Sequence, residues 1–287
     1  MPELPEVETI KRGLSKFCVQ KSIKKVEVLC EKSFIGPKEL AEGARINGLR
    51  RFGKALIFDL SNGVSMMAHL RMTGQLIFRG KDSFAGGHPS DSFFDKLPNK
   101  QTRVIFEMDD GTLFFNDQRK FGFFKLIPTA EVEKDKFIKS LAKEPWEISV
   151  EEFYGKLMRH KNSPIKAVIL DQKVICGLGN IYADEALYDQ KIHPKTPAGN
   201  LSKKQAAGLI RAAQKVMDRS IDSGGSTMAT YVKADGTKGD YLEKFARIFR
   251  RDGESCMRCG TEIEKIRVAG RGTHICPKCQ QLGEKND

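Results

Sequence analysis

The chain has 287 residues, 40% of them hydrophobic, and its 49 Lys and Arg residues outnumber 37 Asp and Glu residues to give a net charge of +12. This length suggests about two domains with a buried core. No stretch approaches the roughly 20 apolar residues of a membrane span and no signal peptide opens the chain, so we expect a cytoplasmic protein without membrane contacts. The positive charge favours a polyanionic partner, with solvated surface lysines as the alternative.

The amino-terminal segment Met1-Pro2-Glu3-Leu4-Pro5-Glu6 can carry chemistry. Removal of Met1 would leave Pro2 with a free secondary amine, and the reference pKa of an α-amino group, roughly 7.7 to 8.0, gives a usable neutral fraction at pH 7. Such an amine attacks an aldehyde-level carbon to form an iminium ion, and Glu3 lies beside it as a proton-transfer partner. Alternatively, the prolines stiffen an exposed terminus and the glutamates cap a helix that we expect at about residues 6–17.

Short β-like runs fill the chain from about Ile23 to Ile127. Turn signals such as Ser61-Asn62-Gly63 and Asp109-Asp110-Gly111 separate them, which predicts a β-sandwich or barrel behind the first helix. The stretch from Gly80 to Gln101 is rich in Gly, Ser, Asp and Pro without periodicity, so we expect an exposed loop there. The clearest runs are Lys24 to Leu29, Ala55 to Leu60, Val64 to His69, Arg103 to Met108 and Thr112 to Asn116.

Three segments of this β region carry side chains that suit nucleic acid. Lys54 follows two arginines ahead of a strand, so it can project towards a phosphate. An exposed apolar side chain near arginine suits insertion into a base stack, and Met72 follows Arg71 while Phe121 follows the basic pair Arg119-Lys120. The alternative is that Met72 and Phe121 belong to the core, as methionine and phenylalanine more often do.

A charged stretch from about Glu131 to Trp146 separates the β region from a helical pattern between about Glu151 and Asp222. Within that pattern, Gly177-Leu178-Gly179-Asn180 predicts a tight turn with Asn180 as the N-cap of the following helix. The exposed amides of such a helix N-terminus can bind a phosphate. An ordinary helix-turn-helix corner explains the segment equally well.

Four of the seven cysteines form two C-x2-C pairs, Cys256 with Cys259 and Cys276 with Cys279. This spacing is typical of a zinc ribbon, in which four thiolates converge tetrahedrally on one metal. Disulfides are the alternative, but the other cysteines are scattered, which favours a reducing compartment. Because four thiolates leave no position for a catalytic water, we expect one structural Zn²⁺.

The segment between the two cysteine pairs alternates and carries glycines around Arg271. This pattern predicts a β-hairpin with Arg271 at its tip. A zinc-stiffened hairpin can present that guanidinium to a phosphate or a base. Alternatively, Arg271 is one more solvated surface charge.

The motifs MPELPEVET, HLRMTGQL, DQRKFG, DQKVICGLGNIYADEALY and the cysteine-flanked RGT occur in one order over nearly the whole chain. Together they closely resemble the formamidopyrimidine-DNA glycosylases, bifunctional glycosylase and abasic-site lyase enzymes of base-excision DNA repair. Members excise oxidised purines, such as 8-oxoguanine and formamidopyrimidines, from duplex DNA. The resemblance implies damaged double-stranded DNA as the partner, no organic cofactor beside the zinc, and a monomer at a bacterial-type nucleoid.

The resemblance also implies catalytic roles for single residues. Pro2 corresponds to the nucleophile that attacks C1′ and forms the Schiff base, and Glu3 to the acid that assists sugar-ring opening. Lys54 corresponds to a lysine of the lyase chemistry that also contacts a phosphate. Arg271 corresponds to the finger arginine that binds the phosphates flanking the lesion and is linked to the second elimination. β-Elimination and then δ-elimination would leave a one-nucleotide gap with phosphates at both ends.

In this family the lesion is flipped out of the duplex, and three side chains that correspond to Met72, Arg119 and Phe121 fill the void. Glu6 and Glu185 would line the same site. The remaining family positions that contact DNA correspond to His69, Gln101, Lys161, Lys166 and Asn180.

The element pattern and the resemblance together predict an α+β fold. An N-terminal helix plus β-sandwich domain precedes a helical helix-two-turns-helix domain with a C-terminal zinc-ribbon hairpin. We expect the catalytic β-sandwich domain at residues 1–130, a linker at 131–150, the helix-two-turns-helix domain at 151–245 and the zinc finger at 246–287.

Some positions depart from the family pattern. Gln101 stands where the family has a DNA-contacting histidine, the loop at 80–98 is longer than usual, and Phe249-Arg250 replaces a common Tyr-Gly pair. None of these is a predicted catalytic residue, so we expect activity to survive while affinity or lesion preference shifts.

Two alternatives stay open on the sequence. A sister glycosylase of the endonuclease VIII type prefers oxidised pyrimidines, although that branch typically has Gly where this chain has Leu4. A non-catalytic zinc-bearing DNA-binding protein would keep the finger and the basic charge without needing Pro2. The sequence does not decide whether Met1 is removed, or whether the segment from about Thr230 to Tyr241 closes over the base.

Overall fold

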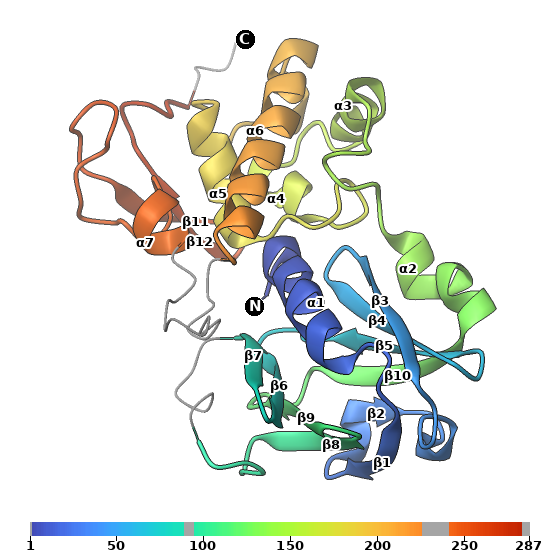
Figure 1. The fold of residues 1–287 in the computed structure, drawn as a ribbon. Coiled ribbons are helices and arrows are strands. Elements are labelled where there is room, and N and C mark those ends of the chain that lie inside the picture. Colours follow the sequence, from blue (N-terminus) through green and yellow to red (C-terminus); the bar gives the residue numbers. More distant parts are fainter. Residues whose placement is uncertain (1, 89–94, 226–240, 283–287) are drawn as a thin grey trace. The chain divides into compact units, whose positions relative to one another are not determined.

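The computed structural model describes residues 2–88, 95–225 and 241–282 (Figure 1). The chain divides into two compact units, and each is described by itself. Unit 1 comprises Met1–Lys139 and Ser220–Tyr241, and unit 2 comprises Ser140–Arg219 and Leu242–Asp287. Within the described part of the chain, no helix has both the length and the apolar composition needed to cross a membrane.

Unit 1 is a sandwich of two five-stranded sheets with a long helix at its start (Figure 1). The first sheet has the strand order β1-β8-β9-β6-β7 and the second β2-β10-β5-β4-β3. Neighbouring strands are antiparallel except β2 and β10, which run parallel. The bounds are α1 Leu4–Cys18, β1 Ile23–Val28, β2 Phe34–Ile35, β3 Ile46–Phe52, β4 Ala55–Leu60, β5 Val64–His69, β6 Gly74–Gly80, β7 Ser83–Gly87, β8 Thr102–Met108, β9 Gly111–Asp117, β10 Phe123–Pro128 and α2 Lys136–Ser140.

One apolar core lies between the two sheets and α1. Its centre is Phe124, whose ring lies 4.9 Å from the Phe106 ring and 5.4 Å from the Phe115 ring. These three side chains come from β10, β8 and β9, and strand alternation turns every second residue of these strands inward. The predicted sandwich is therefore confirmed.

Helix α1 begins at Leu4, two residues earlier than expected, and Pro5 lies within its first turn. Proline is tolerated there because its missing N–H would have no partner inside the helix. Val7, Ile10 and Leu14 form a buried stripe along the helix. Through this stripe α1 packs against the edge strands of both sheets, β3 and β7.

The expectation of a loop from Gly80 to Gln101 is wrong in part, because β7 lies inside it and pairs with β6. Phe84 and Ala85 are buried, but glycines follow them and weaken the strand signal in the sequence. One of these glycines is required by packing, since a Cβ at Gly86 would lie 2.6 Å from a carbon of Ile10 on α1. Residues 89–94 of the expected loop lie outside the described residues.

Unit 2 is helical and ends in a two-stranded hairpin (Figure 1). The expected helical pattern between residues 151 and 222 is confirmed. Ser149 caps α3 by accepting the N–H of Glu152. The bounds are α3 Val150–Arg159, α4 Ile165–Leu170, α5 Asn180–Asp189, α6 Lys203–Asp222, α7 Tyr241–Phe245, β11 Glu264–Val268 and β12 Arg271–Ile275.

The close packing of α1 on β7 predicts an unusual response to alanine at Gly13. Alanine normally stabilises a helix by up to about 1 kcal/mol relative to glycine. A Cβ at Gly13, however, would lie 2.1 Å from the Phe84 ring. We expect Gly13→Ala to lower the free energy of unfolding by about 1–3 kcal/mol through overpacking, measured by urea denaturation.

The matched control is Gly155→Ala in α3, where a new Cβ meets no atom within 4 Å. We expect this variant to gain about 0.5–1 kcal/mol. Equal stabilisation by both substitutions would contradict the packing account.

Candidate functional site

The first residues of unit 1 place Pro2 directly before the N-terminus of α1. Pro2, Glu3 and Glu6 are buried. Glu6 accepts the backbone N–H of Glu3 at 2.8 Å, which is one arm of a capping box. The peptide that joins Pro2 to Glu3 is therefore held against the first turn of the helix. Met1 lies outside the described residues.

Lys54 lies in the two-residue turn between β3 and β4, after Gly53 with a positive φ of 55°. Its side chain is largely buried, with 8% exposed. Arg51 ties this turn to α1, because its guanidinium donates to the Gly53 carbonyl at 3.1 Å and to the Glu8 carboxylate at 2.9 Å. The ion pair between Arg51 and Glu8 therefore joins α1, which follows Pro2 and Glu3, to the turn that carries Lys54.

Glu8 collects three cations, Arg51, Lys11 and Arg12, each at 2.9–3.0 Å. Burial alone raises the pKa of Glu8, but hydrogen bonds from Arg51 and Lys11 outweigh it and lower the pKa to about 2. The carboxylate is thus ionised throughout the physiological range. Sequence reasoning missed Glu8, because its position in an amphipathic helix resembles that of any surface glutamate.

Two loops of unit 1 carry the three predicted void-filling residues. Met72 is half-buried, whereas Arg119 and Phe121 are exposed. The Arg119 guanidinium lies over the Phe121 ring, 4.9 Å from its centroid. The long side chain and the ring therefore form one stacked pair at the surface.

Asp117 holds these two loops together, and it is fully buried. One of its carboxylate oxygens accepts the Thr73 hydroxyl, next to Met72, and the Arg119 N–H. The other oxygen accepts the N–H groups of Phe121 and Gly122 at 2.8 and 2.7 Å. The sequence does not indicate this role of Asp117, since its partner Thr73 lies on a distant segment of the chain.

His69 lies at the end of β5 and is buried. Burial, helped by the nearby charges of Arg71 and Lys54, lowers the pKa of His69 to about 3. Its Nδ1 accepts the Arg71 N–H at 3.1 Å, so the neutral ring carries its proton on Nε2. A contact from His69 to DNA would thus be made by a neutral donor.

Gln101 precedes β8 and is half-buried. Its carbonyl accepts the N–H of Asp117 at 2.9 Å, so the Gln101 backbone helps to hold Asp117 in place. In unit 2, Lys161 is exposed just after α3. Lys166 is fully buried in α4.

Asn180 is the first residue of α5, whose N-cap is Gly179, so the expected capping role of Asn180 is wrong. The Asn180 amide instead donates to the Gly272 carbonyl at 3.0 Å. Because Gly179 is the N-cap, the Asn180 side chain is available for this contact with a residue distant in the sequence. Asn180 therefore joins α5 to the hairpin of β11 and β12.

The hairpin has the predicted form, with the two-residue turn Ala269-Gly270 at positive φ values of 48° and 77°. Arg271 follows the turn as the first residue of β12 and is exposed. The hairpin thus presents the guanidinium at its tip.

Glu185 lies in α5 and is 2% exposed. It accepts the backbone N–H groups of Arg247, Ile248 and Phe249 at 2.9–3.0 Å. This carboxylate therefore anchors the chain that leads into the cysteine-bearing segment. The segment from about Thr230 to Tyr241, considered above for closure over a base, lies outside the described residues up to position 240.

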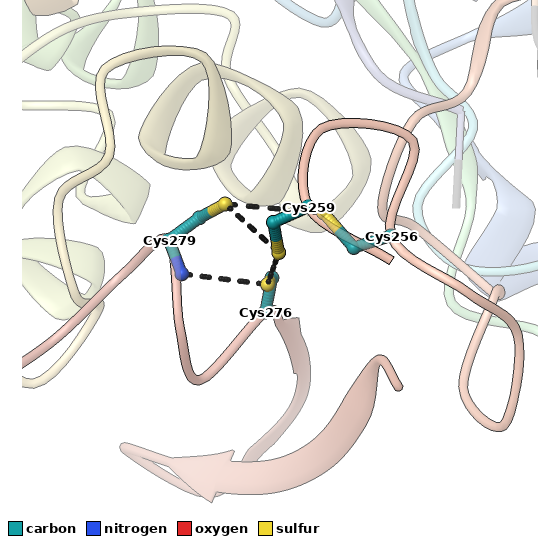
Figure 2. A group of neighbouring side chains, drawn as sticks. All are labelled: Cys256, Cys259, Cys276 and Cys279. Carbon is teal, nitrogen blue, oxygen red and sulfur yellow. Dashed lines mark hydrogen bonds between the residues drawn. The ribbon is translucent and has the colours of Figure 1, made fainter. Parts of the chain in front are cut away.

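The four paired cysteines converge in one cluster, with all four sulfur atoms within 4.8 Å of one another (Figure 2). Sulfur–sulfur distances of 3.4, 3.5 and 3.9 Å exclude disulfides, which need about 2.05 Å. Zinc–sulfur bonds of about 2.3 Å in a tetrahedron separate the sulfurs by about 3.8 Å, so the cluster fits Zn²⁺. Backbone N–H groups of Arg258 and Cys279 point at Cys256 and Cys276, as in zinc knuckles.

Three family models match the chain in order. They are the formamidopyrimidine-DNA glycosylase N-terminal domain at residues 1–124, the H2TH domain of the same enzymes at 141–232, and a zinc finger found in FPG and IleRS at 253–282. The match of the finger model to the cysteine cluster identifies the cluster as a structural zinc site.

Relatives match over nearly the full length. The chain is 41% identical to the formamidopyrimidine-DNA glycosylase of Enterococcus faecalis over 98% of both chains. It is 39% identical to the enzyme of the same name from Pelotomaculum thermopropionicum, over 98% of this chain and 100% of that protein.

Solved structures agree with the fold. Wild-type Lactococcus lactis Fpg (MutM) with a DNA containing N7-benzyl-Fapy-dG matches with a TM-score of 0.85 at 34% identity, over 98% of this chain and 100% of that one. A complex of MutM with DNA containing carbocyclic 8-oxo-G matches with a TM-score of 0.84 at 34% identity, over the same shares.

The network around Asp117 predicts a local effect of Asp117→Asn. An amide carries no charge and has only one accepting atom, so in either orientation the Phe121 and Gly122 N–H groups would lose a charged acceptor, at a cost of about 1.5–3 kcal/mol. We expect amide hydrogen exchange at these two residues, followed by NMR, to accelerate by about 10- to 100-fold. In the control Thr73→Val the Phe121 and Gly122 amides should stay protected from exchange, because they bind the Asp117 oxygen that Thr73 does not contact.

The low pKa of Glu8 predicts how its contribution to stability depends on pH. In the unfolded chain the group titrates near its model value of 4.5, and in the folded protein near 2. The stabilisation is therefore complete above about pH 4.5 and is lost as the pH falls towards 2. We expect urea denaturation to show Glu8→Gln as clearly less stable than the parent at pH 7, with the difference shrinking below about pH 4.5.

The control for this comparison is Glu151→Gln, which breaks an exposed ion pair with Lys203. Exposed pairs contribute at most about 1 kcal/mol, so this variant should stay close to the parent at every pH. A Glu8→Gln deficit that does not change between pH 7 and pH 3 would rule out the ionic explanation.

Proposed function

Because the chain belongs to the formamidopyrimidine-DNA glycosylase family, we propose that it excises oxidised purines from duplex DNA and cleaves the strand at the resulting abasic site. The observation that carries this proposal is the amino terminus, where a buried Pro2-Glu3 pair precedes α1. Few other functions would require a secondary amine beside a buried carboxyl group at the first position of a mature chain.

The first chemical step is nucleophilic displacement. With Met1 removed, the Pro2 nitrogen attacks C1′ of the flipped nucleoside, a C1′–N bond forms, and the bond from C1′ to the base breaks with its electron pair leaving on the base. The Pro2 nitrogen gives up its N–H proton, which neutralises the departing base. Glu3 donates a proton to the ring oxygen as the sugar opens, and the nitrogen lone pair then forms an iminium ion with C1′. The hydrogen bond between Glu6 and the Glu3 backbone supports this role, because it fixes the residue that carries the acid.

The iminium ion drives strand cleavage. It acidifies the C2′ hydrogens, so loss of a proton there expels the 3′ phosphate by β-elimination, and a second elimination expels the 5′ phosphate. We assign to Lys54 a phosphate contact and a part in the lyase steps, supported by its defined turn after Gly53. We assign to Arg271 the phosphates flanking the lesion, supported by its exposure at the hairpin tip.

We propose that Met72, Arg119 and Phe121 fill the space left by the flipped base. The stacking of Arg119 on an exposed Phe121 supports this assignment. Further DNA contacts are proposed for His69, Gln101, Lys161, Lys166 and Asn180.

The proposed domain division is a catalytic domain at 1–130, a linker at 131–150, the helix-two-turns-helix domain at 151–245 and the finger at 246–287. When bound, zinc supplies structural stiffness, and Cys256, Cys259, Cys276 and Cys279 hold it. We further propose that the enzyme acts as a monomer in the cytoplasm, at the nucleoid that contains its substrate. Light scattering at working concentration would test the monomer.

The test of the function is borohydride trapping on a duplex with 8-oxoguanine opposite cytosine. Borohydride reduces the iminium ion, so we expect a covalent adduct with the mass of the protein plus one DNA strand. Pro2→Gly, which replaces the secondary amine, should greatly reduce the adduct. Mass spectrometry of the protein beforehand establishes that Met1 is absent, since an amide at Pro2 cannot form the ion.

A thymine-glycol duplex run in parallel distinguishes the sister class. An adduct mainly on thymine glycol would reassign the chain to oxidised pyrimidines. Binding of the 8-oxoguanine duplex by processed protein without any adduct would leave a DNA-binding module and refute the proposed chemistry.

A further inference from the structure

Lys166 is the most deeply buried cation of the predicted DNA contacts. None of its surface is exposed, and its ammonium lies within bonding distance of three acceptors. These are the Asp184 carboxylate at 2.6 Å, the Thr273 hydroxyl at 2.7 Å and the Gly272 carbonyl at 3.2 Å. The carboxylate forms a buried ion pair with the ammonium, and the hydroxyl and the carbonyl accept hydrogen bonds from it. Lys166 is thus bonded to the hairpin itself rather than directed to solvent.

Asp184 links three elements of unit 2, and it is 1% exposed. Its Oδ1 faces Lys166 on α4. Its Oδ2 accepts the backbone N–H of His274 on β12 at 3.1 Å and lies 3.4 Å from Nδ1 of the same histidine. Since Asp184 belongs to α5, this one carboxylate holds β12 against both helices.

The contacts gather on the residues that directly follow Arg271. The Gly272 carbonyl receives both Lys166 and the amide of Asn180, at 3.2 and 3.0 Å. The hydroxyl of Thr273 and the N–H of His274 are bound as well. The chain beside Arg271 is therefore held at three successive residues, through two backbone groups and one hydroxyl, while the Arg271 side chain remains exposed.

From this geometry we propose that Asp184 is a positioning residue for Arg271, and that it acts through Lys166 and the backbone of β12. The inference rests on the proposed function, in which Arg271 binds the phosphates at the lesion. It also changes the assignment of Lys166, which orients the hairpin and makes no phosphate contact of its own. Buried charges that are fully paired hold one geometry well, because any displacement leaves a charge uncompensated.

The test introduces Asp184→Asn and Lys166→Met separately, each in the parent and in an Arg271→Ala background. Two quantities are measured: the ratio of δ- to β-elimination product on an abasic duplex, and the Kd for a duplex with a tetrahydrofuran abasic analogue. A misplaced catalytic group typically costs on the order of 10- to 100-fold. We expect losses of that size in the δ/β ratio for both variants, and a weaker Kd.

In the Arg271→Ala background the same substitutions should have almost no further effect on either quantity. A role in folding alone would not produce this loss of effect, because a general defect would persist without Arg271. Lys203→Met serves as the matched control, since it breaks an exposed lysine–glutamate pair of the same unit. It should leave both quantities unchanged.

Either single substitution leaves a buried charge unpaired, so each can lower stability. Zinc content and thermal melting are therefore measured for every variant. The double variant Lys166→Met/Asp184→Asn removes both charges and should melt closer to the parent than Lys166→Met does. It should nevertheless retain the δ-elimination defect.

Two results would overturn the inference. One is parent-like δ-elimination and Kd in folded, zinc-loaded variants. The other is a Lys166→Met effect on Kd that persists fully without Arg271 and lowers the salt dependence of binding by about 0.9, as expected for a direct phosphate contact. Failure of the parent to form a borohydride adduct would instead count against the proposed function, and the Kd measurements would still test the coupling.

Discussion

A carboxylate that is removed from water must collect hydrogen bonds or cations, since burying an unpaired charge costs several kcal/mol. This constraint organises the candidate residues of unit 1. Glu8 binds Arg51, and Arg51 in turn binds the carbonyl of Gly53 in the turn that carries Lys54. Asp117 accepts hydrogen bonds from the two loops that carry Met72 and Phe121. Both acids hold the chain beside the candidate side chains, Asp117 through the Thr73 hydroxyl and backbone N–H groups and Glu8 through Arg51.

The same arrangement explains why the side chains that would meet DNA can stay exposed. A loop whose amides point inward at one carboxylate needs no contact from its own side chains to remain ordered. Arg119 and Phe121 therefore stack on each other at the surface while the amide of Phe121 is bound below. Arg271 likewise is exposed at the hairpin tip while Gly272 and Thr273 are held. Ordering the backbone in advance lowers the entropy lost on binding.

Features that depend on local sequence were predictable. The cysteine spacing predicts the zinc cluster, and the glycine after Ala269 predicts the hairpin turn, because each needs only neighbouring residues. Features that depend on distant partners were not. Nothing near Asp117 in the sequence shows that Thr73 will bind it. Gly86 suggests a loop in the sequence, and only the packing of Ile10 of α1 against it explains why a glycine lies in this strand. Asn180 was given a capping role on local grounds, and a glycine at the cap position freed it for Gly272.

Net charge is therefore a poor guide to which cations meet the polyanion. Of the basic residues assigned to DNA by the family resemblance, Lys166 is buried, ion-paired with Asp184 and hydrogen-bonded to the hairpin, and His69 is neutral because its pKa is about 3. Arg51 belongs to a basic run but binds Glu8. By contrast, Arg271 and Lys161 remain exposed. The basic residues thus form two groups: buried cations that are bound within the protein, and exposed cations that can attract phosphate. Only their burial and hydrogen bonding distinguish the two groups.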